Sequence, residues 1–249
     1  MGQSTVLLQF SVANAHSHND YQQKKPFTTA FSAEFGSMET DIFLFHDSLY
    51  VGHEQADIQR HRSLKSLYLD SLDYYLEKRN GQPYPETGRH LQLLIELKTG
   101  AEPTLKRLVL ELEKYPRIIH SKNISIVITG NRPSLDTWNQ YPYYICFDGD
   151  ASKQYPAALL PRLGMMSGDL EEFIEWNGLD QIREDQKQIL RFVINYAHQQ
   201  GKKIRFWDSP DFPQAWSQLI GLGIDWINTD HINQLKEYLE AKDNPGKLY

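Results

Sequence analysis

The stretch SMETDIFLF (residues 37–45) is predicted to form a buried β-strand. Glu39 and Asp41 are two residues apart in it, so on a strand both side chains point to the same face. Their neighbours Met38 and Ile42 are apolar, which indicates a covered strand rather than a solvated one. Two carboxylates on one face of a covered strand point to a charged site inside the fold.

Seven more β-rich runs occur in the chain, and amphipathic or polar stretches separate them. These runs span residues 7–15, 91–98, 124–129, 143–147, 163–167, 202–207 and 224–228. Apolar residues at three- and four-residue spacing predict helices in the intervals. The helices are expected over residues 64–79, 102–116, 183–203, 211–223 and 232–242, with weaker indications at 132–139 and 151–160.

Eight strands that alternate with helices predict an α/β fold with a parallel sheet. Closing that sheet gives a (β/α)8 TIM barrel, whose usual length of about 250 residues suits this chain. No linker, low-complexity segment or internal repeat is visible, so one domain is expected over residues 1–249. The turn-rich stretch 79–90 fits an insertion before the third strand.

The overall composition narrows the class of protein. A formal charge of −6 argues against nonspecific nucleic-acid binding, which depends on clustered Lys and Arg. The one cysteine, Cys146, excludes an intrachain disulfide and a thiolate metal cluster. No run of 18 apolar residues is present, so no transmembrane segment is expected.

The segment VLLQFSVANA (residues 6–15) resembles the tail of a signal peptide and ends in an Ala-x-Ala pattern. No Lys or Arg precedes it, since the first basic residue is Lys24. A secreted or periplasmic origin is therefore a hypothesis, and a cytoplasmic location stays open. The oligomeric state is open as well.

Polar residues gather where the predicted strands end, which is the functional end of such a barrel. They are His16, His18, Glu39, Asp41, His53, Glu96, Lys98, Asn131, Arg132, Trp207, Asp208, Asp230 and His231. Three carboxylates that converge there unpaired would cost several kcal/mol each, through desolvation and mutual repulsion. Either Lys98 and Arg205 neutralise them, or one divalent cation does, and all-oxygen ligands suit Mg²⁺ or Ca²⁺.

The histidines favour the cation and a chemical role. Two groups that exchange protons near neutral pH, beside a carboxylate-bound metal, suit phosphodiester hydrolysis. His18 and His53 lie in loops at the functional end. The histidines at positions 61, 90, 120 and 198 lie in polar or helical contexts and are interpreted as surface or core residues.

Three motifs carry a resemblance to a known family. SHNDY (17–21), METDIFLFHDSLYVGHE (38–54) and LLIELK (93–98) resemble the phosphatidylinositol-phospholipase-C-like and glycerophosphodiester phosphodiesterase superfamily. The chain is most similar to its branch called altered inheritance of mitochondria protein 6. The resemblance implies a single phospholipase-C-like phosphodiesterase barrel that acts on a small phosphodiester or a lipid head group.

The resemblance also implies roles for individual residues. His18 and His53 become the catalytic pair, and Glu39, Asp41 and Glu96 become metal ligands, with Asn19 as a fourth. The implied substrate-binding residues are Lys98, toward the phosphate, and Trp207, in the pocket.

The sequence departs from the family pattern at three places. The usual His-Arg-Gly is His-Asn-Asp here, which leaves Arg132 and Arg205 as candidates to replace the phosphate-binding arginine. Glu54 stands where an Asp is usual. His16 is an additional histidine that could share the role of His18.

Two other functions stay open from the sequence. The His-x-His opening also fits an amidohydrolase or a polymerase-and-histidinol-phosphatase type of metallohydrolase, but the runs 143–147 and 163–167 offer no further histidine. A non-catalytic barrel that binds head groups through Ca²⁺ is the other alternative. Neither the exact diester nor the choice between cyclic-phosphate and hydrolysed product can be predicted.

Overall fold

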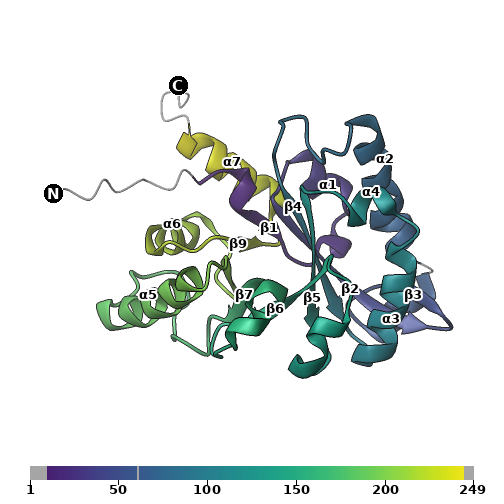
Figure 1. Ribbon diagram of the computed structural model, residues 1–249. Helices are drawn as coiled ribbons and strands as arrows, with labels where there is room; N and C mark the ends of the chain where they lie inside the picture. Colours follow the sequence, from purple (N-terminus) through teal and green to yellow (C-terminus); the bar gives the residue numbers. More distant parts are fainter. Residues whose placement is uncertain (1–9, 61, 244–249) are drawn as a thin grey trace.

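The computed structural model describes residues 10–60 and 62–243. Eight parallel strands form a nearly closed barrel, as predicted (Figure 1). They are β1 (Ala15–Ser17), β2 (Ser37–Phe45), β4 (Leu91–Leu97), β5 (Ile124–Gly130), β6 (Ile145–Asp150), β7 (Leu163–Asp169), β8 (Ile204–Trp207) and β9 (Ile227–Thr229). The hydrogen-bonded order is β8-β7-β6-β5-β4-β2-β1-β9.

The two ends of this order approach each other. Arg205 of β8 and Trp226, just before β9, form a single parallel bridge. The Trp226 amide donates to the Ile204 carbonyl at 3.1 Å. The barrel is therefore closed by a short contact rather than by a full ladder.

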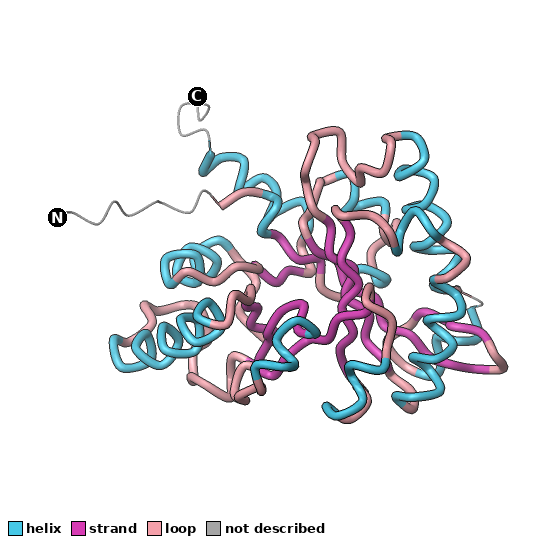
Figure 2. The backbone as a smooth tube through the Cα atoms, viewed as in Figure 1, coloured by secondary structure: helices cyan, strands magenta, loops and turns pink. Residues whose placement is uncertain are grey.

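Helices surround the strands (Figure 2). They are α1 (Thr28–Ser32), α2 (Asp70–Lys78), α3 (Ala101–Leu112), α4 (Pro116–Ile119), α5 (Glu184–Gln199), α6 (Pro213–Leu222) and α7 (Ile232–Asp243). A π-helical turn at Lys65–Leu69 leads into α2. After α5 the chain turns at Gly201, whose φ of +67° is in the left-handed region that favours glycine.

Three predicted elements differ from the structure. The first strand was expected over 7–15, but residues 7–9 lie outside the described range and Val12–Asn14 form a 3₁₀ turn. Ser11 caps that turn, accepting the Ala13 amide at 3.2 Å, and strand pairing begins only at Ala15. Residues 1–9, which include the first four residues of the signal-like segment, and His61 also lie outside the described residues.

The weak helices expected at 132–139 and 151–160 are wrong as α-helices. The structure has short 3₁₀ segments instead, at Leu135–Gln140 and Ala157–Arg162. Pro133 precedes the first, and Pro156 and Pro161 flank or interrupt the second, so continuous i to i−4 bonding cannot form there. The barrel wall around β6 is therefore covered by short turns.

The antiparallel strand β3 (Ser48–Val51) pairs with the end of β2. His46 and Asp47 make the turn between them with φ values of 45° and 61°. This hairpin extends beyond the barrel and places His53 in the loop that follows.

The barrel interior has an apolar floor. Leu94, Val127, Met165 and Trp226 form a buried cluster separate from the main core. Leu94 is two residues before Glu96 on β4, so both point to the inner face. The polar residues at the carboxyl ends of the strands therefore lie above an apolar layer.

Candidate active site

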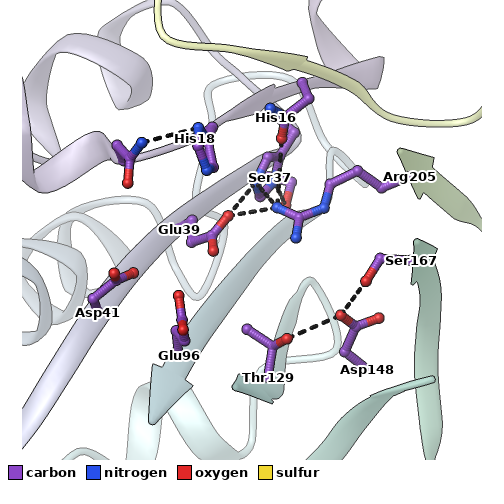
Figure 3. Close-up of polar contacts among 12 residues, drawn as sticks. His16, His18, Ser37, Glu39, Asp41, Glu96, Thr129, Asp148, Ser167 and Arg205 are labelled. Atoms are coloured by element: carbon purple, nitrogen blue, oxygen red, sulfur yellow. Dashed lines mark hydrogen bonds and ion pairs between the residues drawn. The ribbon is translucent and has the colours of Figure 1, made fainter. Parts of the chain in front are cut away.

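A cavity of about 340 Å³ opens at the carboxyl ends of the strands. Residues from most of the strands or from the loops after them line it: His18, Glu39, Glu96, Thr129, Gly130, Arg132, Asp148, Asp150, Ser167, Gly168, Asp169, Glu172, Arg205 and Trp207. Figure 3 shows its polar wall.

The three predicted carboxylates lie together. The register pairs Asp41 with Glu96 on the adjacent strand, and Glu39 is on the same face of β2 as Asp41. One oxygen atom of each of Glu39, Asp41 and Glu96 lies within 4.8 Å of the others. The acidic cluster could thus hold a metal ion.

Both predicted cations also reach this cluster. Arg205 Nη1 lies 2.5 Å from Glu39 Oε2 (Figure 3). Lys98 Nζ lies 3.2 Å from Asp41 Oδ2 and 3.2 Å from Glu96 Oε1. The salt-bridge network and the carboxylate cluster therefore coexist, and the question is whether two cations satisfy two buried acids and one half-buried acid.

At Asp41 they leave one carboxylate oxygen without a partner among the described residues. Burial, followed by the charges of Glu96 and Glu39, raises the pKa of Asp41 to about 7 despite Lys98. Asp41 Oδ1 is buried and has no hydrogen-bond partner among the described residues. An unpartnered carboxylate oxygen beside two other acids fits a small hard cation, which prefers such ligands.

Glu39 is held in its charged form. Burial alone would raise the pKa of Glu39, but the Arg205 charge and a hydrogen bond from His16 outweigh it and lower that pKa well below the usual range. Arg205 therefore favours the ionised form of this carboxylate.

His16 is buried behind Glu39, whereas His18 lines the cavity. His16 is fully buried, with Nδ1 2.7 Å from Ser37 Oγ and Nε2 2.9 Å from Glu39 Oε2. Burial and the Arg205 charge lower the pKa of His16 to about 4. With both ring nitrogens engaged, His16 is a buried neutral support for Glu39.

His18 lies on the cavity wall and is oriented from β9. Its backbone amide donates to the Thr229 carbonyl at 2.9 Å, and its Nδ1 lies 3.1 Å from Asp230 Oδ1. Burial lowers the pKa of His18, but the hydrogen bond to Asp230 and the Glu39 charge outweigh it and raise that pKa above the ordinary value. A histidine held by a carboxylate at Nδ1 is suited to exchange protons at Nε2.

His53 lies on the other side of the acidic cluster. Its half-exposed ring places Nδ1 3.0 Å from Tyr21 Oη and 3.9 Å from Asp41 Oδ2. It lines a second cavity of about 620 Å³, with Lys24 and Arg62 among the other lining residues. The two histidines thus open onto different cavities.

The other predicted site residues are near the cluster in different ways. Asn19 adopts φ 46° at the end of β1, and its Nδ2 lies 3.0 Å from His18 Nδ1. Arg132 lines the first cavity and donates to the backbone carbonyl of Asp148. Trp207 lines the same cavity and is 39 % exposed.

Sequence reasoning missed Tyr21, Asp148 and the partnership of Asp230 with His18. Tyr21 is 1 % exposed and donates to Asp41 Oδ2 at 2.8 Å. Asp148 is buried and accepts from Thr129 and Ser167 (Figure 3). Asp148 directly follows the apolar run 143–147, and a polar residue at the end of such a run was the signal used for the other strands.

The family model described as the AIM6-like phosphodiesterase domain matches residues 6–148, which is more than half of the chain. The chain belongs to this family. A second model, the glycerophosphoryl diester phosphodiesterase family, matches residues 203–232. In this AIM6-like domain the first match includes both candidate catalytic histidines and all three carboxylates, and the second includes Arg205, Trp207 and Asp230.

Relatives agree with this membership. The AIM6-like domain is 26 % identical, over 90 % of its length and 82 % of the relative, to an altered inheritance of mitochondria protein 6 homolog of Arthroderma benhamiae. It is 24 % identical to altered inheritance of mitochondria protein 6 of Kluyveromyces lactis, over 91 % of its length and 72 % of that protein.

The solved structures share the fold. A glycerophosphodiester phosphodiesterase from Parabacteroides distasonis superposes with a TM-score of 0.56 at 14 % identity, covering 92 % of this chain and 97 % of that one. A putative glycerophosphoryl diester phosphodiesterase from Agrobacterium tumefaciens superposes with a TM-score of 0.52 at 12 % identity, covering 92 % of this chain and 98 % of that one. Within residues 10–60 and 62–243, no helix is both long and apolar enough to cross a membrane.

Proposed function

We propose that this AIM6-like domain hydrolyses phosphodiesters with the help of one divalent cation, with His18 and His53 as the acid–base pair. The observation that carries the proposal is the unpartnered Asp41 Oδ1 within a cluster of three carboxylates, flanked by two histidines whose Nδ1 atoms are already engaged.

Glu39, Asp41 and Glu96 would hold the cation, Mg²⁺ or Ca²⁺, with Asn19 as a further oxygen ligand. Such a cation, when bound, neutralises phosphate charge and makes phosphorus easier to attack. The side chains supply the rest. His16 and Arg205 keep Glu39 ionised and fixed, and Lys98 places a positive charge beside the same cluster.

The histidines divide the proton transfers between them. In the Nδ1–H tautomer His18 donates to Asp230, which leaves Nε2 of that ring toward the reaction. One histidine removes the proton of the attacking hydroxyl, and the other protonates the departing oxygen, a contribution of about 10²–10⁴-fold each. Water as the nucleophile gives a phosphomonoester, and a neighbouring substrate hydroxyl gives a cyclic phosphate.

We propose a small glycerophosphodiester-type substrate, on the ground that two solved structures with this fold are named as phosphodiesterases of that class. Its phosphate would meet Lys98 and Arg132, and Trp207 would pack against the alcohol group. His16 is engaged by Ser37 and Glu39, which disfavours the His-x-His metallohydrolase alternative, because that mechanism needs both histidines as metal ligands.

The test is hydrolysis of bis(p-nitrophenyl) phosphate and glycerophosphocholine by the purified chain. The assays contain EDTA, Mg²⁺, Ca²⁺ or Zn²⁺, and a His18→Ala/His53→Ala variant is measured beside the wild type. Turnover that needs Mg²⁺ or Ca²⁺ and is lost in the variant supports the proposal. Folded protein that is silent with every metal would refute it and favour the head-group binding barrel.

A further inference from the structure

Tyr21 is a buried phenol with three polar neighbours around a single oxygen atom. Tyr21 Oη lies 2.7 Å from Asn19 Oδ1, 2.8 Å from Asp41 Oδ2 and 3.0 Å from His53 Nδ1. The ring is 1 % exposed, so no solvent competes for these positions. Tyr21 therefore joins a candidate metal ligand to a candidate catalytic histidine through one atom.

The chemistry of a phenol limits how these contacts can be made. Tyr21 has one hydroxyl proton, and two acceptor atoms lie within its reach, Asp41 Oδ2 and Asn19 Oδ1. A carboxylate is the strongest acceptor within reach, and the proton therefore goes to Asp41. The lone pairs of Oη then remain to accept a hydrogen bond, which His53 can make only with a proton on Nδ1.

We propose that Tyr21 is a positioning residue that fixes His53 in the Nδ1–H tautomer and orients its ring against Asp41. This leaves Nε2 of His53 as the atom that exchanges protons with substrate; among the described residues Nε2 makes no hydrogen bond. The proposal rests on the proposed function for the consequence in catalysis, but not for the tautomer itself.

The two histidines are then held by different kinds of partner. His18 is held by the carboxylate of Asp230, and His53 is held by the neutral hydroxyl of Tyr21. A half-exposed ring such as His53 has few packing contacts to fix it, so its hydrogen bond at Nδ1 carries most of its orientation. Removing that bond should affect turnover much more than substrate binding.

The experiment compares Tyr21→Phe with Tyr68→Phe. Tyr68 Oη donates to Asp20 Oδ2 at 2.8 Å and is as buried as Tyr21, but it contacts neither histidine of the pair. Both variants lose one buried phenol–carboxylate hydrogen bond near the same loop. Only Tyr21→Phe should change the tautomer of His53.

Two readouts are made. Nitrogen-15 NMR of histidine-labelled protein, at about pH 8.5 where an ordinary histidine is neutral, reports the tautomer, with a His53→Gln sample to assign the signal. We expect Nδ1–H in the wild type and in Tyr68→Phe, and a mixture in Tyr21→Phe. We also expect kcat to fall about tenfold or more in Tyr21→Phe at nearly unchanged KM, and to change less than about twofold in Tyr68→Phe.

An Nε2–H tautomer of His53 in the wild type would overturn the proposal without recourse to any variant. Equal losses of kcat in the two tyrosine variants would also overturn it, since both would then act through stability. Absence of turnover in the wild type would instead refute the proposed function and leave the tautomer measurement standing.

Discussion

Replacing Arg205 with Met should leave the buried carboxylate of Glu39 without its counter-ion. Arg205 is 3 % exposed and Glu39 4 % exposed, and their Nη1 and Oε2 atoms are 2.5 Å apart. Removing one partner of such a buried pair costs about 3–5 kcal/mol, because the remaining charge has neither water nor a counter-ion. We expect Arg205→Met to lose about this much free energy of unfolding at pH 7 in EDTA.

The penalty should depend on pH in a definite direction. In the wild type the lowered pKa of Glu39 contributes stability that is present above its unfolded value and is lost as pH falls through the folded value. In the variant the carboxylate is buried without its cation, so its pKa rises and lowering the pH lets Glu39 or His16 take up a proton. Each pH unit can then recover up to about 1.4 kcal/mol for one bound proton.

The assay is urea unfolding, followed by circular dichroism, at about pH 7 and about pH 5 in EDTA. Arg117→Met is the matched control, since Arg117 contacts Asp73 and Glu77 at 3.0 Å each but is 45 % exposed, and such pairs contribute under about 1 kcal/mol. A loss in Arg205→Met no larger than in the control, or equal at both pH values, would refute the reasoning.

Three further changes test the site. Asp41→Asn should raise the stability of the EDTA-treated protein increasingly between about pH 4 and pH 7, because with its pKa raised to about 7 Asp41 stays protonated in the folded protein while the unfolded chain already ionises it, which destabilises the wild type. The variant should also lose the rise in Tm that Mg²⁺ or Ca²⁺ gives the wild type. Asp230→Asn should lower kcat about 10–100-fold and move the pKa of His18 down toward its ordinary value, as seen in the pH–rate profile. Gly130→Ala should weaken cation binding at least tenfold by calorimetry, since its Cβ would lie 2.5 Å from Glu96 Cγ.

Two outcomes would contradict these predictions, and the glycine substitution has a matched control. A pH-independent difference for the Asp41 variant would show that the acids do not repel one another. An unchanged pH–rate profile would separate Asp230 from the catalytic histidine. Gly81→Ala controls for backbone strain, because Gly81 also has a positive φ of +85° but has no atom within 4 Å of an added Cβ.

The parts of the fold and site that depend on the spacing of residues close in sequence could be predicted. The two-residue spacing of Glu39 and Asp41 places both on the inner face of β2, and Glu96 at the end of the next apolar run meets them through the parallel register. The barrel itself followed from eight apolar runs separated by helix patterns. The weak helices were wrong because proline lacks the backbone amide donor that a helix needs, and the spacing of apolar residues does not reveal this.

The contacts that orient the histidines could not be predicted in the same way. Asp230 meets His18 across 212 residues of sequence, and no spacing rule relates them. Tyr21 was visible as the last residue of the SHNDY motif, but its role depends on contacts with Asp41 of β2 and with His53 in the loop after β3. The Arg205–Glu39 pair was foreseen only as an alternative to a metal, whereas the structure contains both the pair and the unsatisfied Asp41.

The central claim is that the acidic cluster makes phosphodiester hydrolysis depend on a cation. The most direct measurement is phosphorus-31 NMR of glycerophosphocholine incubated with the chain in EDTA, followed by addition of Mg²⁺ or Ca²⁺ in excess. We expect no product in EDTA and formation of a phosphomonoester or cyclic phosphate after the cation is added. Equal turnover in EDTA, or none with either cation from folded protein, would contradict the claim.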